Sequence, residues 1–313
     1  MHDIITKEIG RNYHLIPNSK FPIIYHPNST VLSVSDNVVY KMCSDGSYTP
    51  DEIDLITYIK DVRFATMDQI ERAFPDCGFT FERVFELVNE YILNAIVLGE
   101  REDMEVFKRS DSLIIFTLDV GGTYVLNYAG VNSNKWSLKE SHQSTRVIKR
   151  LLAQGEFYLK IFNREEFDIR EFIPRRQFSV GRTVAEVDFA MSISKDSTIR
   201  NILGFVVEDG IEDLNFRSAM ADLDLVFNET QAWKKDYPIS EKPTFVMVVY
   251  STESLMKVAK IITTSTTFKP MDINIILYDQ LTNNDIDALN IFSYNVNDLG
   301  KIKLGKLTRH ALS

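Results

Sequence analysis

Two acidic residues lie where neighbouring strands of one sheet are expected to meet solvent. Asp188 lies inside the segment VAEVDFAMSIS, and Glu208 follows the apolar run ILGFVV of the next predicted strand. Carboxylate oxygens on adjacent strands can hold Mg²⁺, and a cation held in this way activates water and stabilises charge on a phosphate. The pair is therefore the candidate catalytic and metal site of a metal-dependent nuclease.

The residue after this acidic end weighs against catalysis. A lysine near the metal usually helps to stabilise charge, but Gly210 stands two positions after Glu208. The alternative is that Glu208 and Asp209 end a strand and face water, or mark a site that has lost its activity. The sequence favours this non-catalytic interpretation, so no cofactor is expected, and Mg²⁺ is expected only if the site is active.

The elements around the two acids predict a mixed sheet flanked by helices. Segments 184–194, 200–209, 244–251 and 273–280 are predicted strands, the last two apolar enough to be buried on both faces. Helical periodicity covers the segments between and before them: 141–162, 214–231 and 251–265. The order helix-strand-strand-helix-strand-helix-strand predicts an α/β domain over residues 140–313, within an α+β protein overall.

The front of the chain has a different organisation. Three short helices are predicted at 49–61, 65–74 and 80–94, with Thr49, Thr66 and Thr80 as N-caps. Predicted strands at 95–100 and 113–120 follow, and this order is typical of a winged helix-turn-helix domain, here residues 46–135. Residues 1–45 are predicted to be a β-rich segment with strands at 22–26, 30–35 and 37–42.

Together these features resemble the replication-relaxation family of plasmid and conjugative-element proteins. The resemblance rests on the order of elements, on Tyr124-Val125-Leu126-Asn127 with Gly130 after the wing, and on the placement of Asp188 and Glu208. It implies a winged helix followed by a domain similar to PD-(D/E)xK nucleases. The chain departs from the nuclease pattern at Val187, where proline would precede the first acid, and at Gly210. The resemblance implies a DNA-associated accessory or regulatory protein of a mobile element, acting in replication, relaxation or transfer.

The charge distribution leaves DNA binding and protein binding both open. Net charge is −9, and residues 51–117 hold 15 acidic against 7 basic residues. The predicted recognition helix exposes more acids than bases, and such a helix is repelled by phosphate. The candidate DNA contacts are Arg83, Asn89, Lys108, Arg109, Arg175 and Arg176. The alternative is a protein-binding adaptor in which the acidic winged helix docks a basic partner.

A glycine pair offers a further hypothesis. Asp119-Val120-Gly121-Gly122-Thr123 is similar to the phosphate-binding turn of sugar kinases with an actin-like fold, because glycines let backbone amides approach phosphate. That motif needs a second glycine-rich loop, and no other Gly-Gly pair occurs. We therefore favour a hairpin turn after the wing.

Composition sets the remaining expectations. The chain has 313 residues and only two cysteines, Cys43 and Cys77, which is compatible with a reducing, cytoplasmic setting. No apolar run is long enough to cross a membrane, and no histidine spacing suggests a zinc site. A protein partner is expected, and a homodimer is compatible with the sequence.

Overall fold

The computed structural model describes residues 11–27, 35–100, 107, 113–131, 136–195, 198–208, 213–235, 242–264, 273–286, 290–296 and 301–307. It is a mixed α+β protein with two sheets, as the sequence predicts. The chain forms two compact units, residues 1–155 and 156–313, and the boundary between them falls inside one long helix. No helix in the described ranges is both long and apolar enough to span a membrane.

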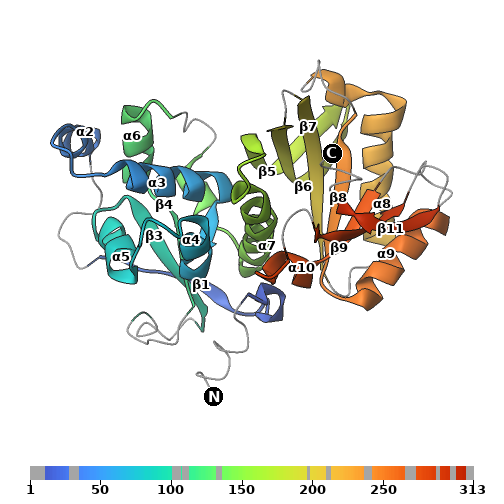
Figure 1. The fold of residues 1–313 in the computed structure, drawn as a ribbon, viewed down its shortest axis with the longest axis horizontal. Helices are drawn as coiled ribbons and strands as arrows, with labels where there is room; N and C mark the ends of the chain where they lie inside the picture. The colour runs from blue at the N-terminus through green and yellow to red at the C-terminus, as the bar shows by residue number, and fades with distance from the viewer. Residues whose placement is uncertain are drawn as a thin grey trace. The chain divides into compact units, whose positions relative to one another are not determined.

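The first unit is built around a four-stranded antiparallel sheet with strand order β1-β3-β4-β2 (Figure 1). Its elements are η1 (Tyr13–Leu15), β1 (Phe21–Ile24), α2 (Asp36–Ser44), α3 (Pro50–Val62), β2 (Phe64–Thr66), α4 (Met67–Ala73), α5 (Phe81–Asn89), β3 (Leu93–Gly99), β4 (Ile114–Leu118), α6 (Val120–Tyr128) and η3 (Leu138–Glu140). The first part of α7 (Thr145–Phe162) completes the unit.

Local capping explains where helices α3, α4 and α5 begin. The side chains of Thr49, Thr66 and Thr80 accept hydrogen bonds from backbone N–H groups three residues later, which confirms the predicted N-caps. At Thr49 and Thr66 the cap is reciprocal, because Glu52 and Gln69 each accept from the N-cap backbone. The third helix, α5, ends at Asn89, earlier than periodicity predicts.

The strand predicted at residues 37–42 is wrong, because this segment lies in helix α2. Its valine and tyrosine residues favour strands, but packing decides: Val39 is buried while Val38 and Tyr40 are exposed. The ring of Tyr40 lies 6.0 Å from that of Tyr128 on α6, measured between centroids. Segment 22–26 is confirmed in part as β1, and the strand predicted at 30–35 lies almost wholly outside the described residues.

The second unit is built around a seven-stranded mixed sheet with strand order β11-β10-β9-β8-β7-β6-β5. Its elements after α7 are β5 (Asp168–Val180), β6 (Thr183–Lys195), β7 (Thr198–Val207), α8 (Asp213–Asp224), the π-helix η4 (Leu225–Glu229), η5 (Ala232–Lys235), β8 (Thr244–Val249), α9 (Thr252–Thr264), β9 (Ile273–Leu277), α10 (Tyr278–Thr282), β10 (Phe292–Val296) and β11 (Ile302–Lys306). Strands β7, β8 and β9 are parallel and the other pairs are antiparallel. The predicted mixed sheet is confirmed, and β5, β10 and β11 are additional to the prediction.

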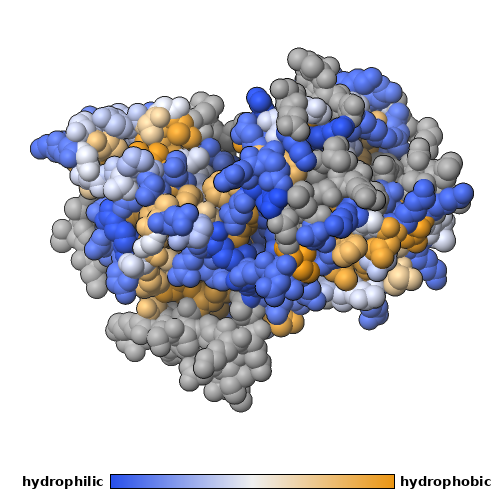
Figure 2. All heavy atoms as spheres, in the orientation of Figure 1, coloured by the Kyte–Doolittle hydropathy of each residue, from blue (hydrophilic) through white to orange (hydrophobic). Residues whose placement is uncertain are grey.

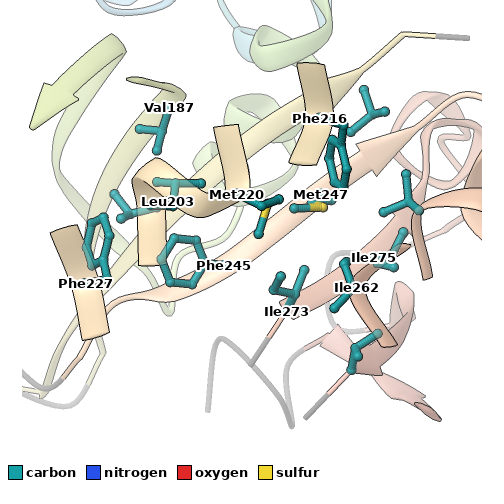
Figure 3. Close-up of a cluster of buried hydrophobic side chains, with 14 of the residues drawn as sticks. Val187, Leu203, Phe216, Met220, Phe227, Phe245, Met247, Ile262, Ile273 and Ile275 are labelled. Atoms are coloured by element: carbon teal, nitrogen blue, oxygen red, sulfur yellow. The ribbon is translucent and has the colours of Figure 1, made fainter. Parts of the chain in front are cut away.

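The core of this unit lies between the sheet and the helices α8 and α9. Phe216 and Met220 of α8 belong to one buried cluster with Phe245 and Met247 of β8 (Figure 3). Burial on this scale is the main stabilising contribution to the domain. The opposite face of the sheet receives α7, whose Phe157 ring lies 5.1 Å from the ring of Phe189 on β6.

Candidate functional site

The exposed face of α5 is predominantly acidic. Val84, Leu87 and Val88 are buried, which fixes the direction in which the remaining side chains point. The exposed residues of α5 are Phe81, Glu82, Glu86 and Asn89. Phe81 is 39% exposed, so an aromatic ring lies among the acids at the start of the helix.

Arg83, the single basic residue of α5, is engaged within the protein. Its guanidinium donates to Oε1 of Glu52 on α3 and, at 2.8 Å, to Oε2 of Glu86. These hydrogen bonds raise the pKa of Arg83 above its ordinary value. Two carboxylates therefore offset the one positive charge that this helix carries, and a phosphate group would have to compete with both of them.

Glu52 is the buried anchor of this arrangement. Its side chain also accepts from Thr49 N–H at 2.8 Å, closing the capping box of α3. Burial by itself would raise the pKa of Glu52, but the hydrogen bonds from Arg83 and Thr49 outweigh it and hold that pKa below its ordinary value. The carboxylate thus stays ionised in a buried position.

A third carboxylate adjoins the same network. Burial raises the pKa of Glu90 above its ordinary value, against the opposing effects of Arg83 and of the hydrogen bond from Tyr48. Burial, together with the neighbouring Glu90, also raises the pKa of Tyr48. Sequence reasoning missed Tyr48 and the pairing of Arg83 with Glu52, a contact across 31 residues.

The predicted basic residues of the wing, Lys108 and Arg109, lie outside the described residues. Phe107 just before them is described, and its ring lies 5.3 Å from that of Tyr25, which in turn lies 4.9 Å from Phe85 of α5. Phe107 is therefore linked to α5 through the ring of Tyr25.

Arg175 and Arg176 lie on β5 in different surroundings. Arg175 has a positive φ of 53°, its side chain is 45% exposed, and its Nε lies 3.7 Å from Oε1 of Glu186. Arg176 is half-buried, and its guanidinium carbon lies 5.5 Å from the centre of the Phe178 ring. Arg175 is accessible to an anion, whereas the guanidinium of Arg176 stacks on an aromatic ring.

Asp188 supports the backbone of the neighbouring strand. It is only 5% exposed, and its Oδ2 accepts a hydrogen bond of 2.8 Å from the N–H of Val206 on β7. Regular pairing of β6 with β7 covers residues 189–195 and 198–204, so this side chain continues the contact beyond the ladder. Glu208 directly follows β7 and is half-buried, and Gly210 lies outside the described residues.

The described ranges contain no group of three or more His, Cys, Asp or Glu side chains arranged to hold a metal ion. One oxygen of Asp188 already accepts a hydrogen bond from Val206 N–H. This bond satisfies a buried backbone donor, so it contributes to the structure of the sheet. What the geometry establishes for this residue is strand support.

The glycine pair after β4 packs a helix closely and does not form the predicted hairpin turn. Asp119 is the N-cap of α6, its Oδ1 accepting from Val120 N–H at 2.6 Å, and Gly121 N–H donates to the carbonyl of Tyr91. A Cβ on Gly122 would lie 2.5 Å from the carbonyl oxygen of Ile92. Helix α6 can approach β3 only because no side chain is present at that position.

Comparisons with known proteins found no relative. No protein-family model matches the chain. Neither the curated proteins nor the solved structures contain a match to it.

Proposed function

We propose that the protein is a non-catalytic accessory protein whose first unit contains a winged helix-turn-helix that binds a partner protein. Support comes from the order α3, β2, α4, α5, β3, β4 and from the antiparallel arrangement of β3, β4 and β2. Three short helices and a β-hairpin in this order are typical of that domain. In this proposal α5 occupies the position of the recognition helix.

The observation that carries the proposal is the acidic face of α5. Glu82 and Glu86 are exposed there, and the positive charge of Arg83 is offset by Glu52 and Glu86. A helix in the major groove lies beside phosphates, so this face is repelled by duplex DNA. A basic protein segment suits it better, and the half-exposed ring of Phe81 offers an apolar anchor.

A second candidate is direct association with DNA, through Asn89, the wing residues Lys108 and Arg109, and the strand residues Arg175 and Arg176. The exposed guanidinium of Arg175, whose closest ion-pair distance is 3.7 Å, favours it. This exposed arginine and the resemblance to proteins of plasmids and conjugative elements together support a role on the DNA of a mobile element. In that case the second unit, nuclease-like but non-catalytic, serves as a platform for DNA backbone.

A salt titration on DNA separates the two candidates. The full chain is titrated against a fluorescent duplex and the matching single strand, from about 50 mM salt upwards, because phosphate contacts strengthen as salt falls. If α5 binds protein, Asn89→Ala leaves DNA affinity unchanged, while Arg175→Ala reports any contact made by the second unit. Loss of duplex binding in Asn89→Ala would place α5 in a DNA groove and overturn the proposal.

A basic probe tests the protein-binding face directly. A labelled peptide of alternating lysine and leucine is titrated against the full chain and against the double variant Glu82→Lys/Glu86→Lys. We expect affinity to fall at least about tenfold, equivalent to roughly 1.4 kcal/mol. The matched control is Asp36→Lys/Asp45→Lys, which changes the same charge at α2 and should retain binding. If both double variants lose the same affinity for the peptide, the effect comes from net charge alone, which would contradict a specific binding site on α5.

The nuclease alternative is tested by incubating supercoiled DNA with the protein and Mg²⁺ or Mn²⁺. The proposal expects no cleavage above background. Cleavage that disappears in both Asp188→Asn and Glu208→Gln would make the protein a metal-dependent nuclease and refute the non-catalytic assignment.

A further inference from the structure

Strand β11 forms one edge of the seven-stranded sheet. It pairs with β10 on its inner side, from Val296↔Ile302 to Phe292↔Lys306. Among the described residues no strand pairs with its outer side. An open strand edge presents backbone N–H and C=O groups in a row, and such a row is a template for a further strand.

Apolar side chains cluster on one face of this edge. Ile302, Leu304 and Phe292 are 46%, 61% and 49% exposed, respectively. In the register of β10 with β11, Leu304 lies opposite Tyr294 and Ile302 opposite Val296, so these side chains share a face. Figure 2 shows hydrophobic side chains gathered over β11, bordered by hydrophilic ones. A contiguous apolar patch with a polar border is typical of an interaction surface.

The same strand carries positive charge. Its sequence, Ile-Lys-Leu-Gly-Lys, contains Lys303 and Lys306 and no acidic residue, and both lysines are exposed. Lysine on an edge strand commonly prevents unwanted pairing. Here the lysines accompany exposed Ile302 and Leu304, which would promote pairing, so the edge is suited to a strand of opposite charge.

We propose that the outer edge of β11 binds an extended acidic segment of a partner protein as an eighth strand. Backbone hydrogen bonds to β11 would supply affinity, with apolar side chains opposite Ile302 and Leu304 and a carboxylate opposite Lys303. A second copy of this chain is the poorer occupant, because its own β11 would bring further lysines against these. This surface is separate from α5 and goes beyond the function proposed above.

Short synthetic peptides test the proposal with the full chain. The probe is a fluorescent peptide of alternating glutamate and valine. Its controls are an uncharged serine–valine peptide, which the acidic face of α5 does not attract, and a glutamate–valine peptide with alternate N-methylated amides. Binding is followed by fluorescence anisotropy. We expect the glutamate–valine peptide to bind at least about tenfold more tightly than either control.

Variants locate the site. Leu304→Asp and Lys303→Glu should each weaken binding of the acidic peptide at least about tenfold. Their matched controls are Val184→Asp, at another exposed apolar position, and Lys41→Glu, at an exposed lysine of α2, and both should bind as the parent does. Circular dichroism confirms that each variant is folded, and a variant that fails to fold is replaced by Leu304→Ser or Lys303→Gln.

Three outcomes would overturn the proposal. These are absence of acidic-peptide binding up to about 1 mM, equal binding of the serine–valine or N-methylated peptide, and loss of binding in the control variants. Analytical ultracentrifugation of the chain alone tests whether a second copy of this chain binds the edge instead. A dimer that dissociates in Leu304→Asp would assign the edge to a second copy and not to an acidic segment.

Discussion

The guanidinium of Arg83 on α5 donates to the buried carboxylate of Glu52 in the first turn of α3. Glu52 also closes the capping box of α3 through Thr49, so a single carboxylate joins the start of one helix to the surface of another. The consequence for function is that the one cation of α5 serves the fold, and the face left to a partner is acidic.

Replacing Glu52 by glutamine should destabilise the protein while leaving α3 capped. A glutamine oxygen still accepts from Thr49 N–H, but the ionic hydrogen bond with Arg83 is lost. Hydrogen bonds to charged groups contribute about 1.5–3 kcal/mol, so we expect a loss of about 1–3 kcal/mol in urea denaturation. Glu82→Gln, on the exposed side of α5, is the control and should change stability by less than about 0.5 kcal/mol. Equal effects of the two substitutions would show that the Arg83–Glu52 pair does not stabilise the fold.

Glu90→Gln should stabilise the protein at neutral pH, whereas Glu52→Gln should destabilise it. Because the pKa of Glu90 is raised in the folded state, its contribution to stability is complete below its unfolded pKa and is lost as pH rises through the folded one. Glutamine removes this loss, so the variant should have a higher melting temperature than the parent at pH 7. The difference should shrink towards about pH 4, near the ordinary pKa of glutamate. A variant less stable than the parent at pH 7, with no change on acidification, would contradict the assignment.

Local signals predicted much of this fold. The capping threonines marked the starts of α3, α4 and α5. The apolar runs that begin at residues 244 and 273 marked the buried strands β8 and β9, although the second strand ends at Leu277, where α10 begins. These signals succeed because a cap or a two-sided burial leaves its pattern within a few neighbouring residues.

Edges and long-range pairs were beyond such patterns. Strand β5 contains Pro174 and the adjacent arginines, and β11 is short and basic, so neither has the apolar run of a central strand. The pairing of Arg83 with Glu52 depends on how α5 packs near α3, which periodicity within either helix does not specify. Because the packing of helices is not encoded in either helix alone, the sequence could identify candidate charged residues but not which of them form ion pairs within the protein.

Asp188 is predicted to matter for stability. Asp188→Ala leaves the Val206 N–H without its acceptor in a buried position, which should cost about 1–3 kcal/mol. Asp188→Asn retains an oxygen that can accept this bond and should cost distinctly less. Urea denaturation of the two variants measures the difference. An alanine variant as stable as the parent would show that the hydrogen bond from Val206 N–H does not stabilise the fold, and would contradict a structural role for Asp188.

Gly204 and Phe189 should show strong energetic coupling. A Cβ on Gly204 would lie 1.9 Å from Cζ of Phe189, and that ring is held between Phe157 and Phe172 with centroids 5.1 and 5.6 Å away. Gly204→Ala should therefore cost about 1–3 kcal/mol through overpacking. In a Phe189→Leu background the ring is absent, so the same substitution should cost much less, and a double-mutant cycle measures the coupling. Additive effects of the two substitutions would mean that the ring moves aside freely, contrary to its packing between Phe172 of β5 and Phe157 of α7.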